Sequence, residues 1–571
     1  MTYQVYRGEE YMDFNELEAW CRQAAAHCPR WVSLTTIGTS RYGRPILLLT
    51  LGDQQKNPND VPTFWIDGGT HAAEWTGVMA VIYAVSSWIE RLLVNDPELE
   101  AWFSRNSVVA LPCLSPDGYQ AMHDGAPFVR SSLRPTVEGT VRSGLDPRDV
   151  DGDGFVRWMR WRDPAGPFVA DEACPSFLRP RRIGDDPELA YFACDEGVFL
   201  HWDGIRTLAS PLKYGLDLNR NFPGHWAPFS MFGMDGGAYP LSEEESRATV
   251  DAFAARRHIG CVLSNHTYTG AILTQPYRQD TPLSDGDIRL MELLAHEAVD
   301  GTTYRVIRTY PDFVYDPKKA IVGVWADTAV VVFGVCAYTL ECWDPFGYAG
   351  LTIEKPAEFF HRPDPDIVRK MLVRFAEDPN TVMPWTPFDH PQLGPVELGG
   401  IDYLRTVRNP PVALLATECA RAMKVADTLR RSLPSVVPHL VCQPLGNQVT
   451  QVTFILENQG FLPTSGLARG ESVQACPSVS VWLQTTPTMT LHQGTSEVSL
   501  PHLDGWGLAR VDGAAHPLYP ELQSRGHKAV AQWIVSGSGT IQCQWQAGRG
   551  GTGVVSATIN EQWIEDKVES L

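Results

Sequence analysis

Short apolar runs alternate along the first part of the chain with longer stretches of helical spacing. Val61–Asp67, Val108–Leu114 and Cys261–Asn265 are continuous apolar runs of strand length. Val330–Leu340 is a longer run of the same kind, and it predicts another buried strand. Glu74–Leu93 instead carries apolar residues at intervals of three and four, which predicts a helix. Strands alternating with helices predict an α/β fold, with a mixed, mostly parallel sheet flanked by helices.

The pattern changes toward the end of the chain. The segment 384–411 is rich in proline and glycine, as at a domain border, and Val412–Leu433 has the spacing of a connecting helix. Beyond it, short β-like runs separated by turns predict an antiparallel β-sandwich. We therefore expect an α/β domain over residues 1–400, a linker and helical strut over 401–434, and a β-sandwich domain over 435–571.

The amino-acid composition limits which binding partners and which cellular compartment are expected. The 571-residue chain has a net charge of −20, which disfavours nucleic acid and anionic membranes as partners. The N-terminus lacks the basic start and apolar stretch of a signal peptide, and no apolar run has the length of a membrane span. The twelve cysteines show no paired spacing, as in a reducing compartment. We expect a cytoplasmic protein; its oligomeric state is not readable from these features.

One apolar run leads directly into a candidate metal-binding motif. After Asp67, two glycines are followed by His71 and, three residues later, by Glu74. Imidazole nitrogens and carboxylate oxygens are ligands of Zn²⁺, and catalytic zinc sites often combine two histidines, one carboxylate and an open position. His266, just after the run Cys261–Asn265, is the candidate third ligand. Because such a pair alone is more often structural, the assignment depends on the motifs that accompany it.

The accompanying motifs form an ordered set. They are Gly38-Thr39-Ser40-Arg41-Tyr42-Gly43-Arg44, Pro116-Asp117-Gly118-Tyr119, Asp217-Leu218-Asn219-Arg220-Asn221-Phe222 and Thr339-Leu340-Glu341-Cys342-Trp343-Asp344. With the two histidines and Glu74, the set resembles the zinc metallocarboxypeptidase family, the carboxypeptidase A-like enzymes. The resemblance covers roughly the first two-thirds of the chain. The added C-terminal β domain is typical of a large, bacterial-type member.

The resemblance implies a reaction. Members of the family hydrolyse the C-terminal amino acid from a peptide, and here zinc would be held by His71, Glu74 and His266. Such an ion lowers the pKa of water and polarises the scissile carbonyl. The family counterpart of Glu341 is the general base that returns the proton to the departing amine. A charge at the end of so apolar a strand is also costly unless it is used or paired.

The resemblance also implies a binding site for the substrate's free carboxylate. Asn219 and Arg220 match the family's carboxylate-binding pair, and a planar guanidinium suits that role. The family places an arginine for the oxyanion shortly after the Pro-Asp-Gly segment. Two residues are candidates there: Arg130 fits the spacing better, and Arg134 could be the oxyanion donor or a second contact to the substrate's anionic group.

Two features of the family pattern are not matched clearly. Counting back from Glu341 places Lys319 at the position of the family's substrate-capping tyrosine, with Tyr310 and Tyr315 further upstream. Either tyrosine could serve if the loop is longer. The same alignment places Trp325-Ala326 near the floor of the specificity pocket, without an acid for a basic side chain, which favours apolar or small terminal residues.

The segment 119–216 is longer than its family counterpart and is expected to be an insertion. Within it, Asp149, Asp151 and Asp153 have the spacing of the first half of a calcium loop. Arg160 occupies the position at which such a loop needs a bidentate glutamate, so a turn-forming acidic loop is the alternative interpretation.

Three functions remain open. The first is a zinc carboxypeptidase acting on peptides. The second keeps the same metal site but cleaves isopeptides, peptidoglycan fragments or N-acyl amino acids, so that the partner is a peptide or an amino-acid conjugate. The third is a non-catalytic peptide-binding scaffold. The presence of both histidines, both acids and the Asn219-Arg220 pair favours an enzyme.

Overall fold

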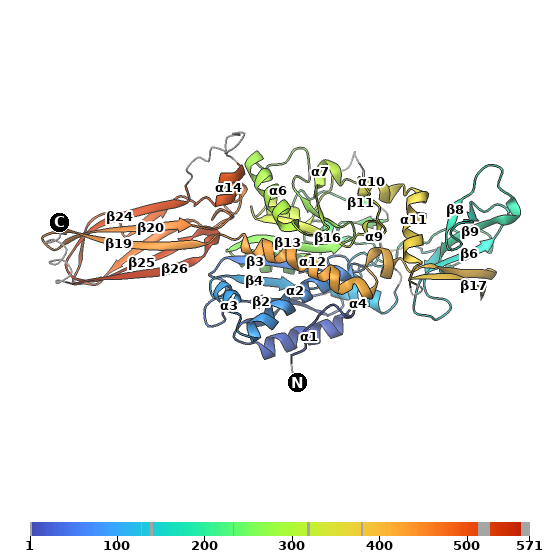
Figure 1. The fold of residues 1–571 in the computed structure, drawn as a ribbon, viewed down its shortest axis with the longest axis horizontal. Coiled ribbons are helices and arrows are strands. Elements are labelled where there is room, and N and C mark those ends of the chain that lie inside the picture. The colour runs from blue at the N-terminus through green and yellow to red at the C-terminus, as the bar shows by residue number, and fades with distance from the viewer. Residues whose placement is uncertain are drawn as a thin grey trace.

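The protein is elongated, with three folded parts in a row (Figure 1). The computed structural model describes residues 3–126, 128–136, 141–231, 233–316, 320–378, 381–511 and 526–560. A β-sandwich lies at one end, the α/β domain lies in the middle, and a second sheet built partly from the insertion lies at the other end.

An eight-stranded sheet forms the centre of the α/β domain. Its spatial order is β1 (Val32–Thr39), β2 (Pro45–Leu51), β4 (Ser107–Leu111), β3 (Thr63–Gly68), β13 (Ile259–Thr267), β16 (Cys336–Cys342), β14 (Ala271–Thr274) and β15 (Arg305–Arg308). The pairs β4–β3, β3–β13, β13–β16 and β14–β15 are parallel, and the other three are antiparallel. The prediction of a mixed, mostly parallel sheet is confirmed.

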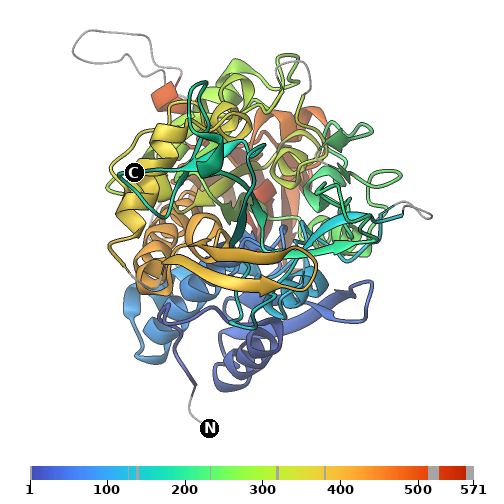
Figure 2. The ribbon, with the colours of Figure 1, turned by 90° about the vertical axis from the view of Figure 1, so that its right-hand side faces the viewer.

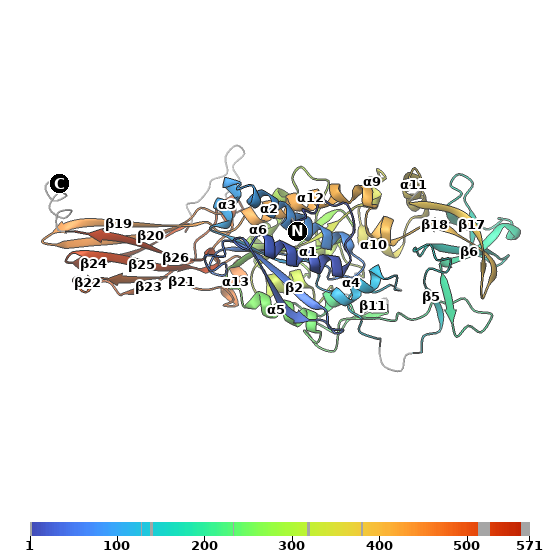
Figure 3. The same ribbon diagram turned by 90° about the horizontal axis from the view of Figure 1, so that it is seen from below.

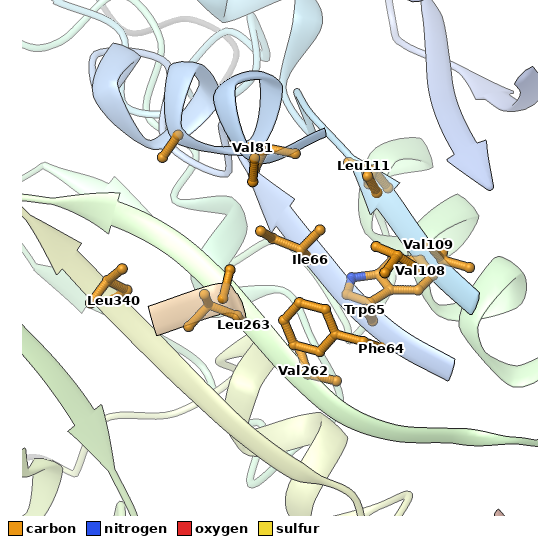
Figure 4. Close-up of a cluster of buried hydrophobic side chains, with 14 of the residues drawn as sticks. Phe64, Trp65, Ile66, Val81, Val108, Val109, Leu111, Val262, Leu263 and Leu340 are labelled. Carbon is orange, nitrogen blue, oxygen red and sulfur yellow. The ribbon is translucent and has the colours of Figure 1, made fainter. Parts of the chain in front are cut away.

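Helices cover both faces of this sheet. They are α1 (Phe14–His27), α2 (Trp75–Leu93), α3 (Pro97–Phe103), α4 (Pro116–His123), α5 (Glu244–Ala254), α6 (Asp285–Val299), α7 (Thr309–Asp312), α8 (Trp325–Val331), α9 (Pro345–Tyr348), α10 (Pro356–His361), α11 (Pro365–Phe375) and α12 (Val412–Arg431). Figure 4 shows part of the core, with Val81 of α2 directed toward Ile66 of β3. Trp65 points the opposite way and contacts Phe253 of α5 and Trp325 of α8.

The central helix α2 is apolar on nearly all sides. By length and composition it could cross a membrane, but most of it is buried inside the protein. The helix α12 packs beside it and, like α2, contacts the strands β3, β13 and β16. The composition of α2 is therefore that of a core helix.

The run Val330–Leu340 is not one continuous strand, so that part of the sequence prediction is wrong. Its first residues end α8, Gly334 turns the chain with a φ of +64°, and β16 begins at Cys336. Every residue of α8 is buried, and periodicity cannot distinguish a fully buried helix from a buried strand.

The insertion forms a sheet together with residues that follow the α/β domain in sequence. Its six strands lie in the order β17 (Val382–His390), β18 (Gly394–Ile401), β6 (Trp158–Arg162), β9 (Ala190–Asp195), β7 (Phe168–Ala170) and β8 (Leu178–Pro180). Two small pairs accompany it: β5 (Gly144–Pro147) with β10 (Gly197–Leu200), and β11 (Ser230–Met231) with β12 (Met234–Asp235). Figure 2 views the molecule from this end.

The proline-rich segment 384–411, expected at a domain border, contributes the hairpin β17–β18 to this sheet. Its prolines Pro384 and Pro387 lie on β17, the edge strand, where a missing amide hydrogen does not interrupt a ladder. A π-helical turn, Leu404–Arg408, then leads into α12.

The C-terminal region forms two four-stranded antiparallel sheets around a core of their own, which confirms the predicted β-sandwich (Figure 3). One sheet has the order β19 (Val436–Gly446), β20 (Val449–Asn458), β24 (Lys528–Ser536) and β22 (Thr490–Gln493). The other has the order β23 (Glu497–Leu500), β21 (Val479–Thr485), β25 (Gly539–Ala547) and β26 (Thr552–Ile559). The short helices α13 (Ala468–Ser472) and α14 (Trp506–Val511) lie near its junction with the α/β domain.

A buried arginine joins the sandwich to the α/β domain. Arg549, only 2% exposed, donates to the backbone carbonyls of Ile259 at the start of β13 and of Phe333 after α8. Its Nε also donates to the carbonyl of Ser465 within the C-terminal region, at 3.1 Å. One guanidinium therefore satisfies carbonyl groups from three separate segments, which would otherwise be buried without donors.

Replacing Arg549 with methionine should destabilise the protein. The three carbonyls would lose their donor inside a dry interface, and we expect the free energy of unfolding to fall by about 3 kcal/mol. Thermal or urea denaturation followed by tryptophan fluorescence measures the change. The matched control is Arg206→Met, because the Arg206 side chain is 73% exposed. Equal stability of the two variants would contradict the bracing role of Arg549.

Candidate metal centre

Strand register brings the predicted site residues together. In the parallel pair β13–β16, His266 lies directly beside Glu341, and in the pair β3–β13, Asn265 lies beside Gly68. The carboxyl ends of three neighbouring strands therefore meet at one edge of the sheet. Ligands collect at this edge in open α/β sheets because the loops that follow the strands begin there.

Glycines allow the first ligand pair to approach this edge. The chain leaves β3 through Gly69, whose φ is +67°, and passes His71 before α2 begins after Glu74. At Gly77, in the first turn of α2, a Cβ atom would lie 2.6 Å from the carbonyl oxygen of Asn265. The start of α2 therefore packs directly on β13, next to His266.

Three donor atoms converge in the buried site. Nδ1 of His71 lies 2.9 Å and Nδ1 of His266 lies 3.0 Å from Oε2 of Glu74, and the two nitrogens are 3.1 Å apart. Tetrahedral zinc ligands at 2.0–2.1 Å from the metal lie about 3.3 Å from one another. The type, number and spacing of these donors fit zinc. The sequence prediction named these three residues.

Two further acids orient the histidines, and the sequence analysis did not assign them this role. Oδ1 of Asp217 lies 3.3 Å from Nε2 of His71. Oγ of Ser264 lies 3.3 Å from Nε2 of His266 and donates to Asp67 at 2.6 Å. The outer nitrogen of each imidazole thus lies beside an oxygen of Asp217 or Ser264 with Nδ1 directed inward, which is the arrangement that metal-binding histidines need. For Asp217, this role could have been inferred from the sequence, because the residue belongs to the same motif as Asn219 and Arg220.

Two guanidinium groups reach the other oxygen of Glu74. Nη1 of Arg130 lies 3.1 Å and Nη1 of Arg408 lies 3.3 Å from Oε1. Burial alone would raise the pKa of the Glu74 carboxyl, but His71, His266 and Arg130 hold it well below its usual value. Glu74 is therefore ionised and suited to bind a cation. Arg408 had no signal in the sequence, because it belongs to none of the motifs.

Glu341 lies at the same cavity in a different electrostatic environment. Burial, together with the negative charge of Glu74, raises the pKa of its carboxyl to about 7. The cavity has a volume of about 420 Å³ and is lined by both glutamates, Arg130 and Arg220. A carboxyl group with a pKa near neutrality can accept and return a proton.

The predicted carboxylate-binding pair is near this centre. Arg220 lines the cavity, its guanidinium lies 5.0 Å from the ring centre of Phe229, and its Nε is buried without a hydrogen-bond partner among the described residues. Asn219, which is buried, accepts a hydrogen bond at Oδ1 from the backbone amide of Trp325. The Nη1 group of Arg220 donates to the backbone carbonyl of Asn219.

The structure separates the two arginines that the sequence left as alternatives. Arg130 lines the cavity and contacts Glu74 and Asp217. Arg134 is instead paired with Asp235, and its Nε lies 3.6 Å from Glu243. Arg134 is also not among the described residues that line the cavity.

The two candidate tyrosines are separated as well. Tyr315 lines the cavity, whereas the hydroxyl of Tyr310 contacts Gln279 at an exposed position. Lys319 lies outside the described residues. The expected pocket floor, Trp325-Ala326, is buried in the core, and neither residue is among the described ones that line this cavity.

The acidic loop of the insertion brings its three aspartates together. Asp149, Asp151 and Asp153 each offer an oxygen within 4.8 Å of the others, at exposed or half-exposed positions. Asp149 accepts hydrogen bonds from the backbone amides of Gly152 and Gly154, as in a turn. These contacts fit the turn-forming interpretation, and calcium binding stays a prediction.

Comparison with known families agrees with this geometry. The sequence model of the zinc carboxypeptidases, peptidase family M14, matches residues 17–352. The chain belongs to this family. A second model, described as a domain of unknown function, matches residues 436–560.

Several characterised relatives of this M14 protein match parts of its sequence. Carboxypeptidase B from Astacus astacus is 35% identical over 109 residues, 19% of this chain and 34% of the relative. Carboxypeptidase B from Homo sapiens is 28% identical over 181 residues, 31% of this chain and 41% of the relative. Inactive metallocarboxypeptidase ECM14 from Ajellomyces dermatitidis is 34% identical over 112 residues, 19% of each chain. The matches span well under half the length of these relatives.

Solved structures also resemble this M14 protein at low identity. Thrombin activatable fibrinolysis inhibitor has 17% identity and a TM-score of 0.43, covering 75% of this chain and 76% of its own. A metallo-carboxypeptidase from Pseudomonas aeruginosa has 12% identity and a TM-score of 0.33, covering 72% of this chain and 68% of its own.

Removing a ligand should remove the metal. His266→Ala deletes one of three donors, so we expect the purified variant to contain well under a tenth of the zinc of the unaltered protein, as measured by mass spectrometry of the metal. His296→Ala is the control, because His296 is exposed on α6 and distant in sequence from the motifs. Full zinc content in His266→Ala would show that the metal binds elsewhere.

Changing Asp217 should weaken zinc binding without removing a ligand. Asp217→Asn loses the charge that holds Nε2 of His71, and outer contacts of this type are worth about 10- to 100-fold in metal affinity. Competition with a chromogenic chelator measures the dissociation constant. An unchanged constant would mean that Asp217 does not orient His71.

Proposed function

We propose that this protein is a zinc carboxypeptidase that removes the C-terminal residue of a peptide. The observation that carries the proposal is the arrangement at one cavity, which is lined by Glu74 of the three converging donors, by Glu341 with its raised pKa, and by Arg220 with a buried, unsatisfied donor. Membership of the M14 family supports the same reaction class.

Each residue has a proposed role in hydrolysis. Zinc bound to the three donors would supply Lewis acidity, which lowers the pKa of water and polarises a carbonyl. Glu341 takes the proton of the attacking water and passes it to the departing amine. Arg130 donates to the oxygen that becomes negative in the tetrahedral transition state. Its contacts with Glu74 and Asp217 keep its guanidinium fixed before substrate arrives.

Recognition of a free C-terminus is proposed for Asn219 and Arg220. The unsatisfied Nε of Arg220 offers one donor to a carboxylate. Because Oδ1 of Asn219 accepts from Trp325, its Nδ2 group is the donor left for the second carboxylate oxygen. Tyr315, which lines the same cavity, is the proposed capping residue above the bound terminus.

Two alternatives use the same residues. An amidohydrolase acting on isopeptides, peptidoglycan fragments or N-acyl amino acids would need the same metal site and base. A binding scaffold would bind peptides without turnover, and relatives named as inactive metallocarboxypeptidases make this a real alternative. Mass spectrometry of products from a library of peptides and amino-acid conjugates distinguishes the three, because the first two predict different broken bonds and the scaffold predicts none. The cytoplasmic location, calcium binding and the preference for apolar or small terminal residues stay predictions.

Glu341→Gln should abolish turnover but preserve binding. Glutamine keeps the size of the side chain but cannot accept the proton, so we expect kcat to fall by about 10²- to 10⁴-fold. Zinc content and peptide affinity should change little, and both are measured on the same preparation. A variant with undiminished kcat would remove the general-base role.

Arg220→Met should reduce the preference for a free C-terminus. The unaltered protein should cleave a free acid far better than the same peptide with an amidated terminus, whereas the variant should lose most of that difference through a raised KM. Arg134→Met is the control, because Arg134 is held by Asp235 away from the cavity. If the unaltered protein cleaves both peptides equally, exopeptidase specificity is wrong.

A further inference from the structure

The cavity extends beyond the catalytic residues into an apolar region whose wall lies outside the M14 match. Phe360, Val368, Met371, Leu372 and Ile401 all line the cavity, and all follow residue 352. They come from α10, α11 and β18. This wall is therefore built by the part of the chain that bridges the α/β domain and the second sheet.

A half-buried arginine, Arg408, lines the same cavity as this wall. Its guanidinium lies 5.3 and 5.8 Å from the ring centres of Tyr268 and Tyr403, and its Nη1 lies 3.3 Å from Glu74. Its Nε is buried without a hydrogen-bond partner among the described residues. The guanidinium therefore has an unused donor at the edge of the cavity that it lines.

The position of Arg408 is fixed by the next residue. Asn409 donates from Nδ2 to the carbonyl of Ala73 at 2.8 Å and accepts at Oδ1 from the backbone amide of Thr76 at 3.0 Å. Both partners flank Glu74 in sequence. The π-helical turn that carries Arg408 is thus tied to the loop that supplies two of the three zinc ligands.

Arg220 and Arg408 line the same cavity as the catalytic pair, in different surroundings. The guanidinium of Arg220 lies 5.0 Å from the ring centre of Phe229, whereas that of Arg408 lies beside Tyr268 and Tyr403 and reaches Glu74. A substrate whose terminal carboxylate binds Arg220 has its acyl half, the part on the amino side of the scissile bond, in the rest of this cavity, which Arg408 and the apolar wall line.

We propose that the apolar wall and Arg408 form the binding site for the acyl half of the substrate, and that this site selects a large apolar residue next to the C-terminal one. The inference rests on the proposed carboxypeptidase function. The apolar side chain packs against α11 and β18, and Arg408 donates to a carbonyl oxygen of the acyl half. An acidic side chain does not fit, because the carboxylate of Glu74 already lies 3.3 Å from this guanidinium.

A peptide series tests the selectivity. The peptides share their C-terminal residue, taken from the library screen, and differ only in the penultimate residue, which is Phe, Leu, Gly or Asp. We expect kcat/KM for Phe and Leu to exceed that for Gly by roughly 10- to 100-fold, and Asp to be the poorest. Equal rates for Phe and Gly would overturn the inference while leaving carboxypeptidase activity established.

Two matched variants test Arg408. Arg408→Met keeps the apolar stem and removes the donor, so KM for the Phe peptide should rise about tenfold or more, with a smaller effect on kcat. Arg405→Met is the control, since Arg405 is on the same turn but pairs with Asp402 and is not among the described residues lining the cavity. Equal effects of the two substitutions would assign Arg408 a purely structural role.

A second pair of variants tests the wall without touching a buried charge. Val368 lines the cavity from α11, and Val368→Trp should fill it and reverse the preference from Phe toward Gly. Val373 lies on the same helix with its side chain 46% exposed, so Val373→Trp should leave the preference unchanged. An unaltered preference in Val368→Trp would show that the penultimate side chain binds elsewhere.

Binding to metal-free protein separates this inference from the proposed reaction. After zinc removal by a chelator, calorimetry should show that N-acetylphenylalanine amide, which has no free carboxylate for Arg220, binds at least tenfold more tightly than N-acetylglycine amide, and that Val368→Trp removes most of the difference. If no peptide is hydrolysed but this binding preference is present, the acyl site is supported and the proposed reaction is wrong. If peptides are hydrolysed and the binding preference is absent, the acyl-site inference is wrong.

Discussion

The carboxylate of Glu74 is the constraint on which the centre of this molecule depends. It is buried, and a buried charge is tolerated only when opposite charges and hydrogen-bond donors surround it. One oxygen faces the imidazoles of His71 and His266, and the other faces Arg130 and Arg408. These partners come from four separate segments of the chain. The stability of the charged group therefore requires the same convergence of segments that builds the metal centre.

The carboxyl groups near Glu74 also have pKa values set by their charged neighbours. Asp217 lies between Arg130 and His71, and the charges of Arg130 and Arg220 together with the His71 contact hold its pKa well below the usual value despite burial. Glu341 is the exception, since burial and its neighbour Glu74 raise its pKa to about 7. The pKa values of Glu74 and Glu341 are thus shifted in opposite directions. Glu74 stays ionised, whereas Glu341 can bind and release a proton near neutral pH. Such a divergence is what separates a ligand from an acid–base group.

The sequence predicted the parts of the site that are encoded by short motifs or by strand periodicity. His71 and Glu74 follow one apolar run, and His266 and Glu341 each lie at the end of another, so parallel pairing alone places them at one edge. Arg408 could not be found in this way. Three helices and a whole hairpin separate it from Glu341, and only the three-dimensional pairing of β18 with the insertion strand β6 returns the chain to the site.

Other differences between sequence and structure have similar physical causes. The prolines of 384–411 predict a domain border, which stays a prediction; the hairpin in this segment belongs to the second sheet, whose edge strand tolerates proline. The run Val330–Leu340 contains the end of α8 and the start of β16, because a segment buried on every side loses the polar face that reveals its period. Local patterns therefore identified the elements that carry ligands, while contacts between distant elements remained hidden.

The segments that follow the M14 match have a direct physical connection to its centre. In α12, Glu418 accepts the backbone amide of Trp343, two residues after Glu341, at 2.7 Å. Asn409 ties the preceding turn to the loop that carries Glu74. At the opposite end of β13 from His266, Arg549 of the sandwich binds the carbonyl of Ile259 at 2.8 Å. The strand that supplies the third ligand is thus held at its start by the C-terminal domain and at its end by the metal centre.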